Sequence, residues 1–380
     1  MTIVSSLEGT GVQEFWQGFL PTGEAQNPIL WHQRRGTWRS LSYKDLNAQA
    51  HCAAAFLMAR GLKKGDAVGL VARQSVDYVV LDLALQFLGA VNVTLPSDLP
   101  LDALHRLCDA YHFRFVHYSD VAAFQQHGQL EILKPRLHTV LISGEDVDEL
   151  DAEKVVTFDR VVELGKIDWR EQSRELTAMK RAVTPEDIYA VSPWIGDPEA
   201  ARPVTFGQIL AAVNHSETIF QEQSVRVAFL AAAPQQQHSR THGIFPAVRR
   251  QAACYLLPEH DLQPDFFREL HPHALITDTV HAEQLYQALP EFLGGGPVSE
   301  KAIAKAHEIL DRRDQALAEG KKDPFMNRVR FRTGNKKLYR KVISALGGQF
   351  NTLICAPTAP APPTQRFLTE CGVRLISDFP

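Results

Sequence analysis

The stretch from residue 37 to residue 118 constrains the fold most, because its apolar positions switch repeatedly between a period of 3.6 and a period of two. Such switching is typical of helices and strands that alternate around a mostly parallel sheet. Ser42 followed by Asp45 predicts a capped helix start, and Gly61 predicts the end of that helix. Gly89 predicts the end of a second helix, just before another strand. The residues therefore predict an α/β fold.

The alternation resumes in the second half of the chain. Three strands are expected there, at 225–230, 252–257 and 274–277. Between the halves, residues 145–181 are charged and weakly periodic, and we expect surface loops and short strands in that region. The sequence thus predicts two mostly parallel sheets flanked by helices, in domains covering 1–180 and 181–380. A helical and basic segment at about 297–345 is expected to protrude from the second domain.

Composition narrows the class of protein. With 380 residues, of which 45% are hydrophobic, the chain can form one large or two medium globular domains. A formal net charge of -4 gives no overall bias toward nucleic acid, and no nucleic-acid partner is expected. Neither a leader pattern nor a long apolar span is evident, so we expect a cytoplasmic protein. The five scattered cysteines favour reduced core thiols, and no metal site is predicted.

Three short segments carry a pattern beyond periodicity: T-W-R-S-L-S-Y-K-D-L from Thr37, G-L-K-K-G-D from Gly61 and G-A-V-N-V from Gly89. In order and spacing they resemble the opening of AMP-binding, adenylate-forming enzymes, and in particular the N-terminal domain of long-chain acyl-CoA synthetases. Weaker similarity at 266–277 and 338–353 extends the resemblance into the second half. It implies the two-sheet body of those acid–thiol ligases, in a chain that lacks their small C-terminal domain.

The first nucleotide motif of that family reads approximately Y-T-S-G-T-T-G-x-P-K-G-V, where glycines let the backbone approach the phosphates and N–H and hydroxyl groups bind them. The corresponding residues here, 193–204, read P-W-I-G-D-P-E-A-A-R-P-V. Only Gly196 and the charge of Arg202 persist as nucleotide-binding candidates. Asp197 and Glu199 place carboxylates near the expected phosphate oxygens, and each like-charge contact costs from ~1 to ~4 kcal/mol at about 4 Å.

A second nucleotide loop of the family, usually S-G-G-A-P-L, aligns with residues 355–360, which read C-A-P-T-A-P. Both glycines are replaced, and Ala359 and Pro360 stand where nucleotide contacts are expected. The proline-rich continuation predicts a stiff, extended connection. Two altered loops predict a loss of ATP affinity, so no cofactor is predicted. ATP and Mg²⁺ are expected only if the chain is an active ligase.

Two further groups of residues have both a structural and a functional interpretation. His238 and His242 are four residues apart, a spacing that can bind a metal on a helix, but no third ligand is apparent. Together with Gly243 they fall where the family places its acyl pocket, although a structural role is the more frequent one for such histidines. The second group is a basic patch made of Arg328, Arg330, Arg332, Lys336, Lys337 and Arg340. A solvated helix face explains such a patch most simply. The alternatives are an anionic membrane surface, an acidic protein partner or a CoA-like phosphate.

The sequence therefore predicts a non-catalytic, acyl-CoA synthetase-like protein with no catalytic residues, which acts as a binding or scaffold partner for acyl or acyl-carrier ligands. The alternative is an active or split carboxylate–CoA ligase that forms acyl-AMP with the help of a partner domain. The signatures of serine hydrolases, dinucleotide-binding proteins and P-loop nucleotidases are absent from the sequence.

Overall fold

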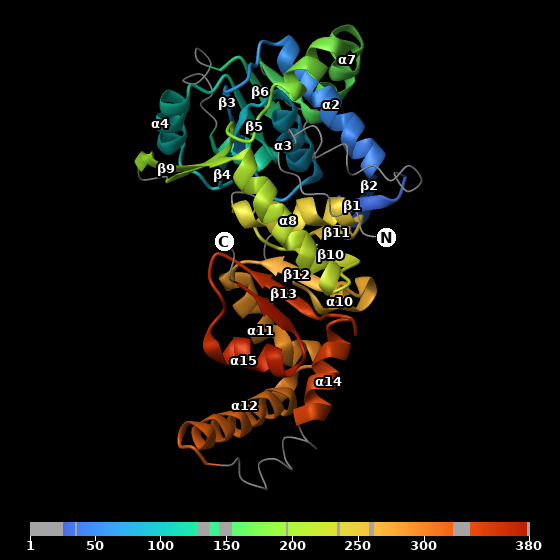
Figure 1. The fold of residues 1–380 in the computed structure, drawn as a ribbon, viewed down its shortest axis with the longest axis vertical. Coiled ribbons are helices and arrows are strands. Elements are labelled where there is room, and N and C mark those ends of the chain that lie inside the picture. Colours follow the sequence, from blue (N-terminus) through green and yellow to red (C-terminus); the bar gives the residue numbers. More distant parts are fainter. Residues whose placement is uncertain are drawn as a thin grey trace. The chain divides into compact units, whose positions relative to one another are not determined.

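The chain folds into two compact units in a computed structural model. The structure describes residues 26–34, 36–127, 137–143, 154–194, 197–233, 236–257, 262–321 and 335–377. The first unit comprises Met1–Ser216 and Ala233–Thr241, and the second comprises Glu217–Ala232 and His242–Pro380 (Figure 1). Each unit contains a sheet flanked by helices, which confirms the predicted α/β fold class. The domain boundary expected at residue 180 stays a prediction, since these units describe packing and not independent folding.

The first unit is built on a mostly parallel sheet with the strand order β7-β6-β5-β3-β4-β8-β9. Its strands are β3 (Ala67–Val71), β4 (Val91–Leu95), β5 (Phe115–Tyr118), β6 (Thr139–Ile142), β7 (Val155–Thr157), β8 (Ile188–Trp194) and β9 (Asp197–Thr205). The last pair, β8 and β9, is antiparallel, whereas the other neighbours are parallel. Strands β1 (Pro28–Arg34) and β2 (Thr37–Ser42) form an antiparallel hairpin, and both belong to the other seven-stranded sheet.

Two helix ends of this unit, at Ser42 and Gly89, coincide with predicted signals. The helices are α2 (Tyr43–Ala59), α3 (Val76–Leu88), α4 (Leu101–Tyr111), α5 (Val121–Gln126), α7 (Phe158–Arg181) and the first part of α8 (Phe206–Glu222). The Ser42 hydroxyl accepts the Asp45 backbone N–H at 3.2 Å, which confirms the cap. Gly89 ends α3 with a φ of 62°, a left-handed conformation that glycine adopts without strain.

Helix α7 corrects one expectation. Residues 145–181 were expected to form loops and short strands, but Phe158–Arg181 is helical apart from a kink at Gln172. Val161 and Leu176 of α7 are buried, whereas Ile167 is 55% exposed, so a narrow apolar stripe suffices to dock this charged helix. Gly165 allows a very close approach to α2, because a Cβ at this position would lie 2.0 Å from the Cys52 carbonyl oxygen. The charge of the segment masked its amphipathic pattern.

The second unit contains five parallel strands in the order β14-β13-β12-β10-β11. They are β10 (Val227–Leu230), β11 (Ala253–Leu256), β12 (Ala274–Thr277), β13 (Thr352–Cys355) and β14 (Arg374–Ile376). The helices are α9 (Phe245–Arg250), α10 (Pro264–Leu270), α11 (Thr279–Phe292), α12 (Gly296–Ala318), α14 (Lys336–Ala345) and α15 (Pro362–Glu370). A π-helical turn, η2 (Ser239–Ile244), precedes α9.

Aromatic rings form part of the second core. Phe267 on α10 makes edge contacts with Phe229, Phe292 and Phe350, at centroid distances of 5.0, 5.3 and 6.0 Å. Such edge-to-face arrangements stabilise a core beyond the burial of their area. In the part of the chain that the structure describes, no helix combines the length and the apolar character needed to cross a membrane.

Candidate nucleotide-binding loops and polar clusters

The segment aligned with the phosphate-binding loop forms a hairpin. Strands β8 and β9 pair as far as Trp194 opposite Asp197, so only two residues connect them. Gly196 is one of these two and lies outside the described residues. Arg202 is exposed on β9, opposite Ser192. Residues of a paired strand direct their N–H groups within the plane of the sheet, so consecutive N–H groups do not converge on one phosphate as they do in a glycine loop.

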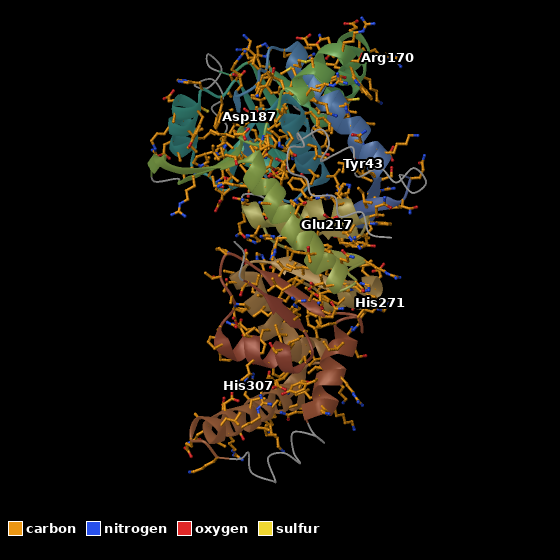
Figure 2. All side chains as sticks on the ribbon, in the orientation of Figure 1. Tyr43, Arg170, Asp187, Glu217, His271 and His307 are labelled. Carbon is orange, nitrogen blue, oxygen red and sulfur yellow. The ribbon has the colours of Figure 1, made fainter. Side chains whose placement is uncertain are left out.

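The turn that leads into this hairpin is firmly held. Asp187, labelled in Figure 2, accepts the backbone N–H of Thr184 at 2.7 Å and pairs with Lys64 at 2.6 Å. Burial raises the pKa of Asp187, but the Lys64 ammonium and the Thr184 hydrogen bonds outweigh it and leave that pKa below its usual value. The start of β8 is therefore fixed by a charged carboxylate, just before the altered segment.

Side chains of the protein itself make hydrogen bonds to the backbone of the loop after β13. The Thr279 hydroxyl donates a hydrogen bond to the Thr358 carbonyl at 2.7 Å, and the Cys355 thiol points to the same oxygen at 3.2 Å. Ala359 is half-buried and Pro360 is buried. The Pro360 carbonyl accepts a hydrogen bond from the Gln365 side chain at 2.6 Å. The polar backbone groups that a nucleotide would need here are thus already partly paired.

A carboxylate caps the N-terminus of α15, the helix that follows this loop. Glu283 on α11 accepts the Ala361 backbone N–H at 2.6 Å and the Thr364 hydroxyl at 2.7 Å, with one carboxylate oxygen for each. The next two residues, Pro362 and Pro363, have no N–H to donate. The N-terminus of α15 therefore already holds an anionic group of the chain itself, which competes with any phosphate for the same position.

The three acyl-pocket candidates lie in two different units. His238 belongs to the first unit and is 8% exposed, whereas His242 belongs to the second and is 5% exposed. Gly243 packs tightly in the second unit, because a Cβ there would lie 2.8 Å from a methyl group of Leu230. Their role in an acyl pocket stays a prediction. Among the described residues, no three His, Cys, Asp or Glu side chains come together as a metal site would require.

Sequence reasoning missed a buried polar cluster in the first unit, centred on Asp82 of α3. The Tyr189 hydroxyl donates to the Asp82 carboxylate at 2.6 Å, and the Asn92 amide donates to it at 2.5 Å. Arg240 lies 3.8 Å from Asp82 and donates to the Tyr78 hydroxyl at 3.2 Å. Asp82 and Arg240 are only 2% and 1% exposed, so the pair is removed from water.

Burial, the ion pair and the two neighbouring tyrosines shift the pKa values in this cluster. Burial raises the pKa of Asp82, although the Arg240 guanidinium lowers it. Burial lowers the pKa of Arg240, but Tyr189, Tyr78 and Asp82 together raise it by more. The net pKa lies above its usual value, so the guanidinium stays charged. The hydrogen bonds from Tyr189 and Asn92 offset part of the cost of burying this ion pair, although Nε of Arg240 makes no hydrogen bond to a described residue. One signal was available in the sequence, since Asp82 is a carboxylate within an otherwise apolar helix stretch.

Only half of the basic patch can be placed. Arg328, Arg330 and Arg332 lie outside the described residues. Lys336, Lys337 and Arg340 are exposed on α14. Tyr339 and Val342 of the same helix are buried, so α14 presents its cations on one side. A shallow pocket of about 490 Å³ lies beside Lys336, Arg340 and Gly348.

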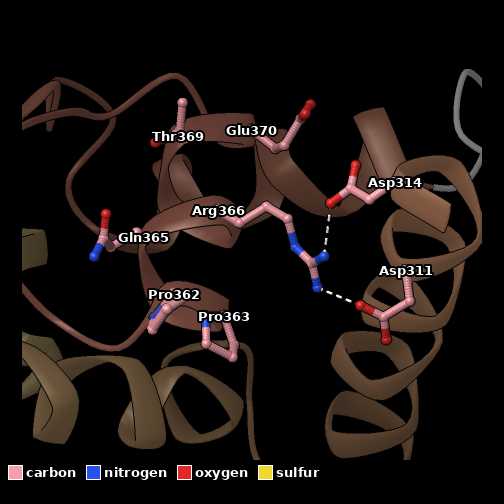
Figure 3. A pocket seen from close by; sticks show the side chains of 8 residues that line it. All are labelled: Asp311, Asp314, Pro362, Pro363, Gln365, Arg366, Thr369 and Glu370. Carbon is pink, nitrogen blue, oxygen red and sulfur yellow. Dashed lines mark hydrogen bonds and ion pairs between the residues drawn. The ribbon is translucent and has the colours of Figure 1, made fainter. Parts of the chain in front are cut away.

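A second pocket, of about 660 Å³, is lined by residues of α12 and α15 (Figure 3). Arg366 extends from α15 and pairs with Asp311 at 2.5 Å and with Asp314 at 2.8 Å. Pro362 and Pro363 line another part of the same pocket. Because Arg366 is paired with both aspartates of the pocket, and Glu370 pairs with Arg313 of α12, we assign these charged groups to the packing of α15 against α12.

Comparison with known proteins agrees with this architecture. Residues 23–192 match the family of AMP-binding enzymes, and the match ends just before the altered 193–204 segment. The chain is 30% identical over 141 residues to surfactin synthase subunit 2 from Bacillus subtilis (strain 168). That alignment covers 35% of this chain and 4% of the other protein.

Solved structures of adenylate-forming enzymes have the same fold. The A domain of carboxylic acid reductase from Segniliparus rugosus superposes with a TM-score of 0.62 at 15% identity, over 96% of this chain and 58% of that one. The anthranilate CoA ligase AuaEII gives 0.62 at 14% identity, over 96% and 58%. MatB from Rhodopseudomonas palustris gives 0.60 at 14%, over 96% and 59%. At such identities the likeness concerns the fold, and this chain spans less than two thirds of each relative.

Proposed function

Starting from the match of residues 23–192 to AMP-binding enzymes, we propose that this chain is a non-catalytic, acyl-CoA synthetase-like protein that binds an acyl or acyl-carrier ligand. It retains the two-sheet body of adenylate-forming ligases and uses it as a binding scaffold. The adenylate-forming ligase fold rests on the solved structures that the chain resembles. The loss of adenylation rests on the two altered loops.

The observation that carries the proposal is the β8–β9 hairpin. A triphosphate needs a loop whose N–H groups converge on it, and here Trp194 and Asp197 pair across a connection of two residues. The carboxylates of Asp197 and Glu199 add repulsion toward phosphate oxygens. Backbone geometry and charge thus both oppose ATP in the first unit.

The loop after β13 gives independent support from the second unit. Glu283 holds the Ala361 N–H and the Thr364 hydroxyl, and two prolines remove the next N–H groups. An incoming nucleotide would have to displace a bonded carboxylate at this position. Hydrogen bonds to a charged group contribute about 1.5–3 kcal/mol each, so this displacement is costly.

Isothermal titration tests the proposal. We expect no saturable heat with ATP–Mg²⁺, which corresponds to a Kd above about 1 mM and a binding free energy weaker than about 4.1 kcal/mol. We expect saturable binding of acyl-CoA or of an acylated carrier protein. A double variant, D197N/E199Q, separates the two causes: if the hairpin excludes ATP, removing the charges leaves ATP unbound. Tight ATP binding to the unaltered chain would refute the proposal.

The competing function is one subunit of a split ligase. The observation that favours it is the match of residues 23–192 to AMP-binding enzymes. The test is ATP–pyrophosphate exchange with a panel of carboxylic acids, with and without a separately expressed domain that supplies a reactive lysine. Exchange that depends on the added domain would establish this alternative, and its absence would leave the binding protein as the function.

A further inference from the structure

Lys180, in the last turn of α7, lies against aromatic rings from other helices of the first unit. Its Nζ atom is 3.1 Å from Nε2 of His51 on α2 and 4.0 Å from the ring centre of Phe87 on α3. The His51 ring stacks on Trp169 with centroids 5.0 Å apart. Among the described residues, no carboxylate comes within ion-pair distance of Lys180. This lysine therefore lacks the counter-charge that normally holds an ammonium group protonated.

The hydrogen bonds of His51 define which ring nitrogen carries its proton. Nδ1 lies 2.8 Å from the Asn47 carbonyl oxygen, which only accepts, so Nδ1 carries the hydrogen. Nε2 then presents a lone pair to Lys180, and Lys180 donates to it. Burial together with the Lys180 charge lowers the pKa of His51 to about 4, so the ring stays neutral at physiological pH.

Partial burial acts on the lysine in the same direction. It lowers the pKa of Lys180 to about 8, while the side chain remains partly accessible to solvent. At pH 7.5 roughly a quarter of Lys180 is then a neutral amine, against roughly 0.1% for a lysine with the ordinary pKa of about 10.4. Only the neutral amine has the lone pair that attacks a carbonyl carbon.

We propose that Lys180 is a site of covalent modification by activated small acyl groups, carried as acyl phosphates or acyl thioesters. Its Nζ lone pair attacks the acyl carbon and forms a C–N bond. The C–O bond to phosphate or the C–S bond to the thiol then breaks, and the leaving group departs with the bonding electrons. The proton lost from nitrogen passes by way of His51 Nε2 to solvent or to the leaving group, and a neutral amide results.

Acylation of Lys180 removes a charge without leaving an oppositely charged side chain unpaired. No ion pair is broken, and the amide keeps one N–H that can still donate to His51. The new group lies on a face formed by α2, α3 and α7. This site is separate from the altered nucleotide loops and does not depend on the proposed binding function.

The wild-type chain provides the first test. It is incubated in separate arms with acetyl phosphate and with acetyl-CoA at pH 7.5, and acetylation rates are measured at each lysine by peptide mass spectrometry. Lys166, exposed on the same helix, is the internal control. We expect Lys180 to react at least about ten times faster than Lys166 in one or both arms, with a rate midpoint near pH 8. A rate equal to or below that of Lys166 in both arms overturns the proposal.

Two variants at position 51 test the local cause. H51E places a carboxylate beside Lys180, which stabilises the ammonium form, so we expect acetylation of Lys180 to fall toward the Lys166 rate. H51Q keeps a neutral acceptor and serves as the matched control with a retained preference for Lys180. Equal rates in the two variants overturn the assignment to this environment. The pH profile of the unaltered protein decides the matter if either variant fails to fold.

Discussion

The Tyr189 hydroxyl lies 2.6 Å from Oδ2 of Asp82, and this contact joins two residues 107 positions apart. It couples β8, the strand that enters the altered hairpin, to helix α3 in the interior of the first unit. Arg240 completes the arrangement at 3.8 Å from the same carboxylate. The hairpin is therefore connected at its base to a buried charge network.

Breaking the ion pair from one side should be costly. D82L leaves Arg240 buried without its carboxylate, and we expect it to lower the free energy of unfolding by about 3–5 kcal/mol. D82L/R240M replaces both charges by apolar groups and should recover most of the loss. Urea unfolding followed by fluorescence measures both. If the double variant is as unstable as D82L, the charge network is not the cause.

The carboxylate cap of α15 can be tested on α11. E283A removes the acceptor of the Ala361 N–H and the Thr364 hydroxyl, and we expect a loss of about 2 kcal/mol in unfolding free energy. E291A, an exposed position on the same helix, should change stability by less than about 0.5 kcal/mol. Equal effects in the two variants would argue against a role for the cap.

Gly165 should not tolerate a methyl group. In G165A the new Cβ would meet the Cys52 carbonyl oxygen, so α2 and α7 must move apart. We expect destabilisation of about 1–3 kcal/mol, typical of overpacking. S173A, at an exposed position on α7, controls for the change in helix propensity. Wild-type stability of G165A would show that the two helices can separate without cost.

Acid should destabilise the first unit through His51. Its folded pKa of about 4 lies below the unfolded value of about 6.5, so as the pH falls the unfolded chain binds the proton first. The stabilisation is fully present above pH 6.5 and is lost toward pH 4, by up to about 1.4 kcal/mol per pH unit. In H51Q, the unfolding free energy should depend less steeply on pH between pH 6.5 and pH 4, by the equivalent of one bound proton. An unchanged pH dependence would contradict the lowered pKa.

The cationic side of α14 is our candidate for contact with anionic lipid. Each lysine near such a surface contributes about 1 kcal/mol, so K336E/K337E should weaken binding to phosphatidylserine vesicles at least about 30-fold. K301E/K305E reverses the same charge at exposed positions on α12 and is the control. Sedimentation at two salt concentrations provides the measurement. An equal loss in the control would assign any binding to net charge, and no binding at all would favour a solvated helix.

Local signals allowed much of the fold to be predicted. The Ser42 cap, the left-handed Gly89 and strands such as β12 depend on neighbouring residues, and the structure has them where the sequence indicates. Helix α7 was missed because its charged residues hide a narrow apolar stripe. Asp82 and Arg240 were missed because residues far apart in sequence meet only in the folded state. Their pairing leaves no periodic signal.

The candidate site was only partly predictable. Alignment located the altered loops at residues 193–204 and 355–360, and their missing glycines indicate a loss of phosphate contacts. The hairpin register and the Glu283 cap required the structure, because both depend on which backbone groups are paired. No sequence motif marks Lys180, because the residues around it come from three separate helices.

The short connection between Trp194 and Asp197 also limits how this protein could change. A loop that wraps a triphosphate needs enough chain to leave one strand, surround the ligand and return to the next. Point substitutions alter the chemistry of a connection but not its length. A lineage or a designer seeking to restore nucleotide binding here would have to insert residues, so glycine and lysine substitutions alone should fail.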